Sequence, residues 1–120
     1  MADKNIFNDF CSVDDIKNYV NNVVEMRIED ICVFEKQLLF SIMAYVFEHI
    51  HQKYQNMATV NKLLQMAYLK DNTGHRIFDF VIVSIPKDDI ARTNYINVRK
   101  KCDENTYHHI INDIYVNVIK

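Results

Sequence analysis

Apolar residues recur every three or four positions along most of the chain, which is the spacing of one face of an α-helix. After Ser12 the chain carries Asp14 and Asp15 and then an apolar series at helical spacing, Ile16, Val20, Val23 and Val24. A hydroxyl side chain at the N-cap and acidic residues in the first turn both favour the start of a helix. The pattern therefore predicts a helix over about 13–26, followed by a connector at 27–29.

The longest predicted helix runs over about 30–54 and is apolar around most of its circumference. One broad face carries Ile31, Phe34, Leu38, Ile42, Tyr45, Val46, His49 and Ile50, and a second stripe carries Leu39, Met43 and Phe47. A helix that is apolar on most sides is covered by neighbours on most sides. We therefore expect this helix at the centre of a bundle, with its methionine and aromatic side chains in the core.

A third helix is predicted between an N-cap at Asn56 and a turn at 71–74. Its apolar face consists of Val60, Leu63, Leu64, Ala67 and Tyr68. The next segment, 75–85, is ambiguous, because its β-branched and aromatic residues would also suit a strand. A single strand would have no partner in this chain, so we expect a short helix or an irregular packed segment there.

Two further helices are predicted in the last third of the chain. Pro86 and two aspartates precede a helix that ends near Lys101 and buries Ile90, Ala91, Tyr95 and Val98. Asp103 or Asn105 can cap the last helix. Its apolar face carries Tyr107, Ile110, Ile111, Ile114, Tyr115 and Val118.

The composition supports an all-α fold in a single domain. The 120 residues include one glycine and one proline, which is fewer than the turns of a β-rich domain require. A chain of this length can bury well over half of its unfolded surface without the help of a disulfide or a metal. We therefore predict one domain over 1–120, a compact bundle of about five to seven helices around the long central helix.

Net charge and cysteine content limit the compartment and the partners. The formal net charge is −2 and the pI is near 6.2, so no overall attraction to nucleic acid or to an anionic membrane follows. Three cysteines without paired spacing, and no signal peptide, indicate reduced thiols in the cytoplasm. The longest uncharged apolar run, between Lys36 and Glu48, is about half as long as a membrane-spanning helix, so we expect no membrane contact.

The sequence contains no recognisable catalytic or cofactor-binding motif. Gly74 is the only glycine, so no glycine-rich phosphate-binding loop can form. The histidine pairs at 49/51 and 108/109 point to different helix faces, which is unsuitable for holding one metal ion. The aspartate pairs at 14/15 and 88/89 are explained by helix capping. We therefore expect a domain without enzymatic activity, cofactor or metal.

Basic residues gather on the fifth predicted helix. Arg92 and Arg99 are two turns apart on one face, with Lys100 and Lys101 beside the second of them. Such a face could contact DNA phosphates or an acidic partner protein. Cations in the last turn of a helix also oppose the helix dipole favourably, so an ordinary solvated face is the alternative.

The packing and capping residues of 7–118 share a pattern with a known protein family. The most similar segment is Gln55-Asn56-Met57-Ala58-Thr59-Val60, followed by Leu63-Leu64 and Ala67. Other similar segments are Ile6-Phe7-Asn8-Asp9-Phe10, Asp15-Ile16, Val20-Asn21-Asn22, Phe34-Glu35-Lys36, Ala44-Tyr45-Val46, and Ile90-Ala91 with Tyr95. On these residues the chain resembles the all-α domain of type IV secretion coupling proteins, the TraG/TraD-type conjugation ATPases of Gram-positive bacteria. It departs from the family at Cys102-Asp103-Glu104-Asn105, where relatives carry a small turn with glycine.

The resemblance implies an insertion domain of a membrane-anchored hexameric motor, whose ATP-binding loop and membrane anchor belong to other parts of the protein. The chain would then be a domain excised from a larger motor protein. Its implied role is to recognise transfer substrates in the cytoplasm, namely the relaxase, accessory relaxosome proteins and DNA. We expect the isolated domain to be a monomer that binds no small-molecule substrate.

Two other functions remain open on the sequence. A stand-alone DNA-binding regulator of the helix-turn-helix type is suggested by the turn at 70–77 between helical segments. Its acidic pI and the apolar segment after the turn do not suit a DNA groove. A small helical enzyme would depend on scattered histidines and cysteines alone.

Overall fold

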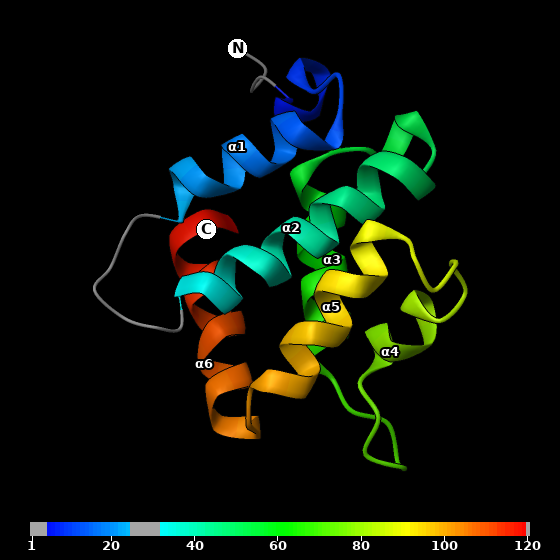
Figure 1. Ribbon diagram of the computed structural model, residues 1–120, viewed down its shortest axis with the longest axis vertical. Helices are drawn as coiled ribbons and strands as arrows, with labels where there is room; N and C mark the ends of the chain where they lie inside the picture. The colour runs from blue at the N-terminus through cyan, green and yellow to red at the C-terminus, as the bar shows by residue number, and fades with distance from the viewer. Residues whose placement is uncertain (1–4, 25–31, 120) are drawn as a thin grey trace.

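The long apolar helix forms the centre of the fold. The computed structural model describes residues 5–24 and 32–119, and these residues form six α-helices and no β-strand. Helix α2 (Cys32–His49) contacts α1 (Val13–Val23), α3 (Met57–Tyr68), α5 (Ile90–Lys101) and α6 (Glu104–Ile114). Figure 1 shows α2 crossing the middle of the molecule, with α1 above it and α5 and α6 beside it. The predicted all-α bundle around a central helix is therefore confirmed.

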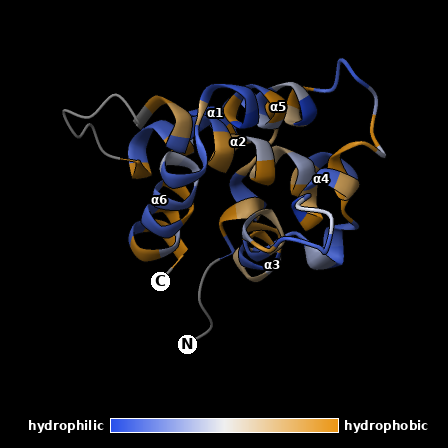
Figure 2. Ribbon diagram, turned by 90° about the horizontal axis from the view of Figure 1, so that it is seen from below, coloured by the Kyte–Doolittle hydropathy of each residue, from blue (hydrophilic) through white to orange (hydrophobic). Residues whose placement is uncertain are grey.

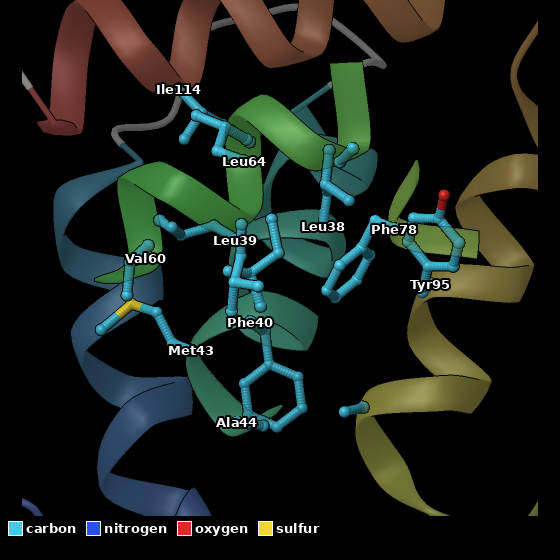
Figure 3. Packing of buried hydrophobic residues seen from close by; sticks show 14 of the residues in the cluster. Leu38, Leu39, Phe40, Met43, Ala44, Val60, Leu64, Phe78, Tyr95 and Ile114 are labelled. Carbon is cyan, nitrogen blue, oxygen red and sulfur yellow. The ribbon is translucent and has the colours of Figure 1, made fainter. Parts of the chain in front are cut away.

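The core is built around one stretch of α2. All but one of the residues from 38 to 46 are buried, namely Leu38, Leu39, Phe40, Ser41, Ile42, Met43, Ala44 and Val46. In Figure 3, α2 side chains lie between Val60 and Leu64 of α3 and Tyr95 of α5. The outer helices carry both hydrophilic and hydrophobic residues (Figure 2), as expected where one side faces the core and the other faces solvent.

The ends of the first two helices differ in detail from the prediction. Ser12 occupies the N-cap position of α1, but its side chain accepts no hydrogen bond, and Asp15 Oδ2 instead accepts from the backbone N–H of Cys11 at 2.8 Å. Helix α2 ends at His49, five residues earlier than predicted. The reason is Gln55, whose side-chain amide donates to the carbonyls of Phe47 and Ile50 and so satisfies the end of the helix.

Some predicted boundaries lie outside the described residues. These are the connector at 27–29 and the start of the second helix at 30. The end of the first helix is described, and it differs from the prediction: α1 ends at Val23, three residues before 26, and the backbone of Val24 is not helical. After α2, a single 3₁₀ turn, η2 (Gln52–Tyr54), leads to α3. Asn56 caps α3 as predicted, since its Oδ1 accepts from the backbone N–H of Thr59 at 2.9 Å.

The ambiguous segment after α3 forms a loop and a short helix, α4 (Ile77–Ile82). The loop over 69–76 turns at Gly74, whose φ of +86° is favourable for glycine, and an isolated bridge joins Lys70 to Arg76. Helix α4 buries Phe78 and Ile82 in the core, whereas Phe80 and Val83 are more than half exposed.

The last two helices start at aspartate N-caps. Asp89 accepts from the backbone N–H of Ala91 at 2.9 Å in α5, and Asp103 accepts from that of Thr106 at 2.7 Å in α6. Helix α6 continues into a π-helical turn, η3 (Tyr115–Ile119). Within the described residues, no helix combines the length and the apolar character required to cross a lipid bilayer.

Candidate functional site

A shallow basic depression lies along the outer side of α5. Its volume is about 400 Å³, and it is lined by Lys87, Arg92, Thr93, Ile96, Asn97 and Lys100. We call this surface the basic depression. Its lining contains three cations, one hydroxyl and one amide, and it contains no carboxylate. This combination of side chains suits an anion with several oxygen atoms.

Arg92 is held in place at one side of the basic depression. Its Nη1 donates to the carbonyl of Ile85 at 2.7 Å and, more weakly, to that of Val83 at 3.4 Å. These two carbonyls belong to the segment that follows α4, so Arg92 ties that segment to α5. The guanidinium thereby has a fixed position before any ligand arrives, which lowers the entropic cost of binding.

The two lysines of the basic depression are free to meet a ligand. Lys87 and Lys100 are exposed, and neither lies within 4.0 Å of a carboxylate among the residues that the structure describes. Asn97 is fixed from below, because its Nδ2 donates to Gln37 Oε1 of α2 at 2.8 Å. The depression is therefore a helix surface with exposed cations at its rim, which suits the binding of an anion.

Arg99 lies away from the basic depression. Its guanidinium carbon is 4.7 Å from the centre of the Tyr107 ring, and its Nε and Nη1 each lie 3.7 Å from a carboxylate oxygen, of Asp79 and Glu104 respectively. The structure thus brings together Arg92 and Lys100 of the four predicted basic residues. It places Arg99 in an internal network, and Lys101 is exposed outside the lining.

The sequence analysis missed Lys87 as a neighbour of these cations. Lys87 follows Pro86 in the segment between α4 and α5, and helical spacing along α5 cannot show how that segment folds back. The signal that could have suggested it is Arg92 itself, an arginine in the first turn of a helix directly after an irregular segment. A guanidinium in that position can bind the free carbonyls of the preceding chain.

A second group of charges surrounds Arg76, which is buried with a side-chain exposure of 2%. We call Lys70, Arg76, Arg99, Glu104 and His108 the Arg76 cluster. Glu104 Oε2 lies 2.5 Å from Arg76 Nη2 and 3.1 Å from Lys70 Nζ, and His108 Nε2 lies 2.8 Å from Arg76 Nη2. The hydrogen bond from Lys70, supported by the charges of Arg76 and Arg99, holds the pKa of Glu104 below its usual value.

Two buried tyrosines border the Arg76 cluster. Tyr95 donates from its hydroxyl to Asp79 Oδ1 at 2.5 Å, and Tyr107 donates to the carbonyl of Ala67 at 2.8 Å. Burial raises the pKa of Tyr107 to about 12, and burial raises the pKa of Tyr95 as well. Both hydroxyls therefore stay protonated at neutral pH and act as hydrogen-bond donors within the fold.

An apolar groove runs between α3 and the α6–η3 segment. Its volume is about 420 Å³, and its lining residues are Asn61, Leu64, Gln65, Tyr68, Leu69, His108, Ile111, Asn112 and Tyr115. We call this surface the α3–α6 groove. Leu64 and Ile111 are buried at its floor, while Tyr68, Leu69 and Tyr115 are about half exposed at its rim. A groove of this kind can accept apolar side chains of a partner.

The histidines and cysteines form no metal-binding group among the described residues. No group of three or more His, Cys, Asp or Glu side chains converges there in a way that could hold a metal ion. His49 is exposed at the end of α2, and its Nε2 lies 2.8 Å from Asp89 Oδ2. His108 Nε2 contacts Arg76 Nη2, and Cys11 and Cys102 are free thiols.

The comparisons with known proteins identify no relative. No protein-family model matches the chain, and no curated protein and no solved structure matches it either. The resemblance to the coupling-protein domain therefore depends on the sequence pattern described above.

Proposed function

We propose that this chain is a non-catalytic recognition domain of a conjugative type IV secretion coupling protein. In this role it acts on the cytoplasmic side, binds relaxosome components and presents them to the motor. The basic depression on α5 is the contact surface for the DNA or for an acidic face of a relaxosome protein. The sequence pattern supports the family, and the depression supports an anionic partner.

The observation that carries the proposal is the grouping of Lys87, Arg92 and Lys100 without a carboxylate among them. Thr93 and Asn97 add a hydroxyl and an amide, which often contact phosphate oxygens together with Arg and Lys. No aromatic side chain lines the depression, so stacking on bases has no support there. We therefore expect contacts to the phosphate backbone, which position the domain without reading the sequence.

The experiment is a titration of the folded domain with single-stranded DNA, duplex DNA and the cognate relaxase at two salt concentrations. If three cations each contact one phosphate of a duplex, the logarithm of affinity should fall with the logarithm of salt with a slope of about −2.7. Between about 50 and 200 mM salt the affinity would then fall about 40-fold. Binding to neither DNA nor relaxase by a domain shown to be folded would contradict recognition as its function.

Single charge removals then test the surface itself. Lys87→Gln and Lys100→Gln should each weaken DNA binding for all sequences and reduce the salt slope by about one. Lys62→Gln is the matched control, because Lys62 is an exposed lysine on α3 that does not line the depression. An equal effect of all three substitutions would indicate unspecific charge attraction and no defined site.

The stand-alone helix-turn-helix regulator has less support from the geometry. The segment that joins α3 to α4 has eight residues, 69–76, whereas the turn of a helix-turn-helix has about three or four. Helix α4 has six residues, of which Phe78 and Ile82 are buried, so it presents little surface to a DNA groove. Sequence-specific duplex binding by the isolated chain would restore this alternative.

The surrounding coding sequence provides a test that needs no binding assay. A coupling protein would encode a phosphate-binding loop before this segment and the acidic strand of an ATPase after it. An open reading frame that lacks both would remove the coupling-protein assignment, whereas the anion-binding surface would still need explanation.

A further inference from the structure

Arg76 is a buried cation whose main counter-charge is a half-exposed side chain. Arg76 is the largest fully buried side chain among the described residues, while the side chain of Glu104 is 53% exposed. A buried charge is stable only when it is paired and hydrogen-bonded. In this fold that pairing depends on a carboxylate that can turn into solvent.

The guanidinium of Arg76 is only partly satisfied by Glu104. Its Nε–H and one Nη2–H point in the same direction and form an edge that matches the two oxygens of a carboxylate. Glu104 meets Nη2 alone, at 2.5 Å, and the buried Nε has no acceptor among the described residues. The arginine therefore offers a two-point carboxylate site that the chain itself fills at one point.

The same guanidinium borders the α3–α6 groove. Arg76 Nη1 donates to the carbonyl of Tyr68, and Nη2 lies 2.8 Å from His108 Nε2; both Tyr68 and His108 line the groove. None of the lining residues is Lys, Arg, Asp or Glu. A site with apolar walls and a cation at one end complements a ligand that is apolar with one negative group at its end.

The groove contains a further unsatisfied polar atom. Asn61 lines the groove, and its Oδ1 is buried without a hydrogen-bond donor among the described residues. A backbone N–H of an incoming peptide is a suitable donor for such a carbonyl oxygen. A nucleic acid fits poorly, because its repeated phosphates would lie on walls that carry no cation.

We propose that the α3–α6 groove and the Arg76 cluster form one binding site for a peptide of a partner protein, in which an aspartate or glutamate lies next to apolar residues. The peptide carboxylate replaces Glu104 on Arg76 and also reaches Nε, while Glu104 turns into solvent. The apolar side chains of the peptide cover Leu64 and Ile111. This site lies between α3 and α6 and is separate from the basic depression on α5.

The test is an NMR titration of the ¹⁵N-labelled protein with three probes. These are the peptide acetyl-Leu-Ala-Leu-Leu-Glu-amide, the same peptide with Gln in place of Glu, and inorganic phosphate. The Glu peptide should shift the amide signals of Leu64, Tyr68 and His108 and the Nε–H signal of Arg76. The Gln peptide should bind about tenfold more weakly, because it loses the charge-assisted hydrogen bonds.

Substitution of Glu104 gives the result that a merely structural cluster would not give. Glu104 competes with the peptide carboxylate for Arg76. If the Arg76–Glu104 ion pair is formed in about nine of ten molecules, Glu104→Gln should raise the affinity for the Glu peptide about tenfold. Lys70→Gln should weaken binding of the Glu peptide, because Lys70 Nζ lies 3.1 Å from Glu104 Oε2, the position that the peptide carboxylate would take. Glu48→Gln and Lys62→Gln are the exposed controls and should change nothing.

Four outcomes would overturn the proposal. They are equal binding of the Glu and Gln peptides, the same shifts with phosphate alone, no tightening by Glu104→Gln, and no shifts at millimolar peptide. A circular-dichroism spectrum of each variant shows whether it is folded. If Glu104→Gln is unfolded, Lys70→Gln and the comparison of the three probes still decide the question.

Discussion

Ser41 on α2 donates a hydrogen bond from Oγ to the backbone carbonyl of Ala91 on α5 over 2.6 Å. Both residues are fully buried, and both are small, so the two helix backbones can approach closely at this crossing. Helix α5 carries the basic depression on its other side. The position of the candidate binding surface is therefore set by a packing contact in the core.

The first prediction concerns this crossing. Ala91→Leu should destabilise the fold by about 1–3 kcal/mol, because three added carbons must be placed between two packed helices. Urea unfolding followed by circular dichroism measures the change. Ala58→Leu is the matched control, since Ala58 is exposed on α3 and leucine suits a helix equally well there. Equal stability of the two variants would show that the α2–α5 crossing tolerates a wider separation.

The second prediction tests the central position of α2. Leu39→Ala should cost about 2–5 kcal/mol, because Leu39 is fully buried and its removal leaves a cavity among helices on several sides. Val33→Ala on the same helix should change stability by less than about 0.5 kcal/mol, since Val33 is 61% exposed. A small effect of Leu39→Ala would mean that the core can collapse around the missing side chain.

The periodicity of the sequence was sufficient to find the helices. Apolar spacing and polar N-caps such as Asn56 and Asp103 located α3 and the end of α5 within two residues. The last helix is shorter than its predicted apolar face, because α6 ends at Ile114 and Tyr115 lies half exposed in the π-helical turn η3. The end of α2 was wrong because it is set by the side chain of Gln55, which reaches back to two carbonyls. Such a contact depends on the path of the chain after the helix, and spacing does not encode that path.

The candidate sites were predictable only in part. The sequence groups Arg92 with Arg99 because they are seven residues apart, yet Arg92 faces the segment after α4 and Arg99 faces Tyr107 of α6. Long side chains on one face of a helix can turn to opposite sides, and the neighbouring elements decide which way. Arg76 gave no signal at all, because nothing in its local sequence indicates that α6 will bury it.

The third prediction separates the two roles of Asp89. Its Oδ1 caps α5 and its Oδ2 lies 2.8 Å from His49 Nε2. Asp89→Ala removes both contacts and should cost about 1 kcal/mol or slightly more, whereas Asp89→Asn keeps a capping oxygen and should cost less. Asp88→Ala is the control, because Asp88 is exposed and makes no capping bond in the described part of the chain. Thermal unfolding at pH 7 compares the three.

The fourth prediction distinguishes Arg99 from the lysines next to it. Arg99→Ala should destabilise the fold by about 1–2 kcal/mol, since it removes a guanidinium that covers the Tyr107 ring and approaches two carboxylates. It should leave DNA affinity unchanged under conditions where the variant is folded. Lys101→Ala should change neither the stability of the fold nor the DNA affinity. A loss of DNA affinity in folded Arg99→Ala would extend the basic depression to the end of α5.

The last prediction is the pH dependence of stability on the acid side. Asp71, Asp103 and Glu104 all have a pKa below the usual value, because Thr73, the backbone of Thr106 and Lys70, respectively, donate hydrogen bonds to the ionised carboxylates. A depressed pKa in the folded state means that the unfolded chain binds protons first as the pH falls. The stability contributed by these groups is therefore complete above about pH 5 and is lost progressively below about pH 4, as the pH falls through the folded-state pKa values.

Urea unfolding between neutral pH and about pH 3 measures this loss of stability. Glu104→Gln should make the dependence of stability on pH less steep, because the side chain at this position no longer titrates. An unchanged slope in Glu104→Gln would show that Glu104 is equally protonated in the folded and unfolded states, and hence that Lys70 and Arg76 do not hold it in solution.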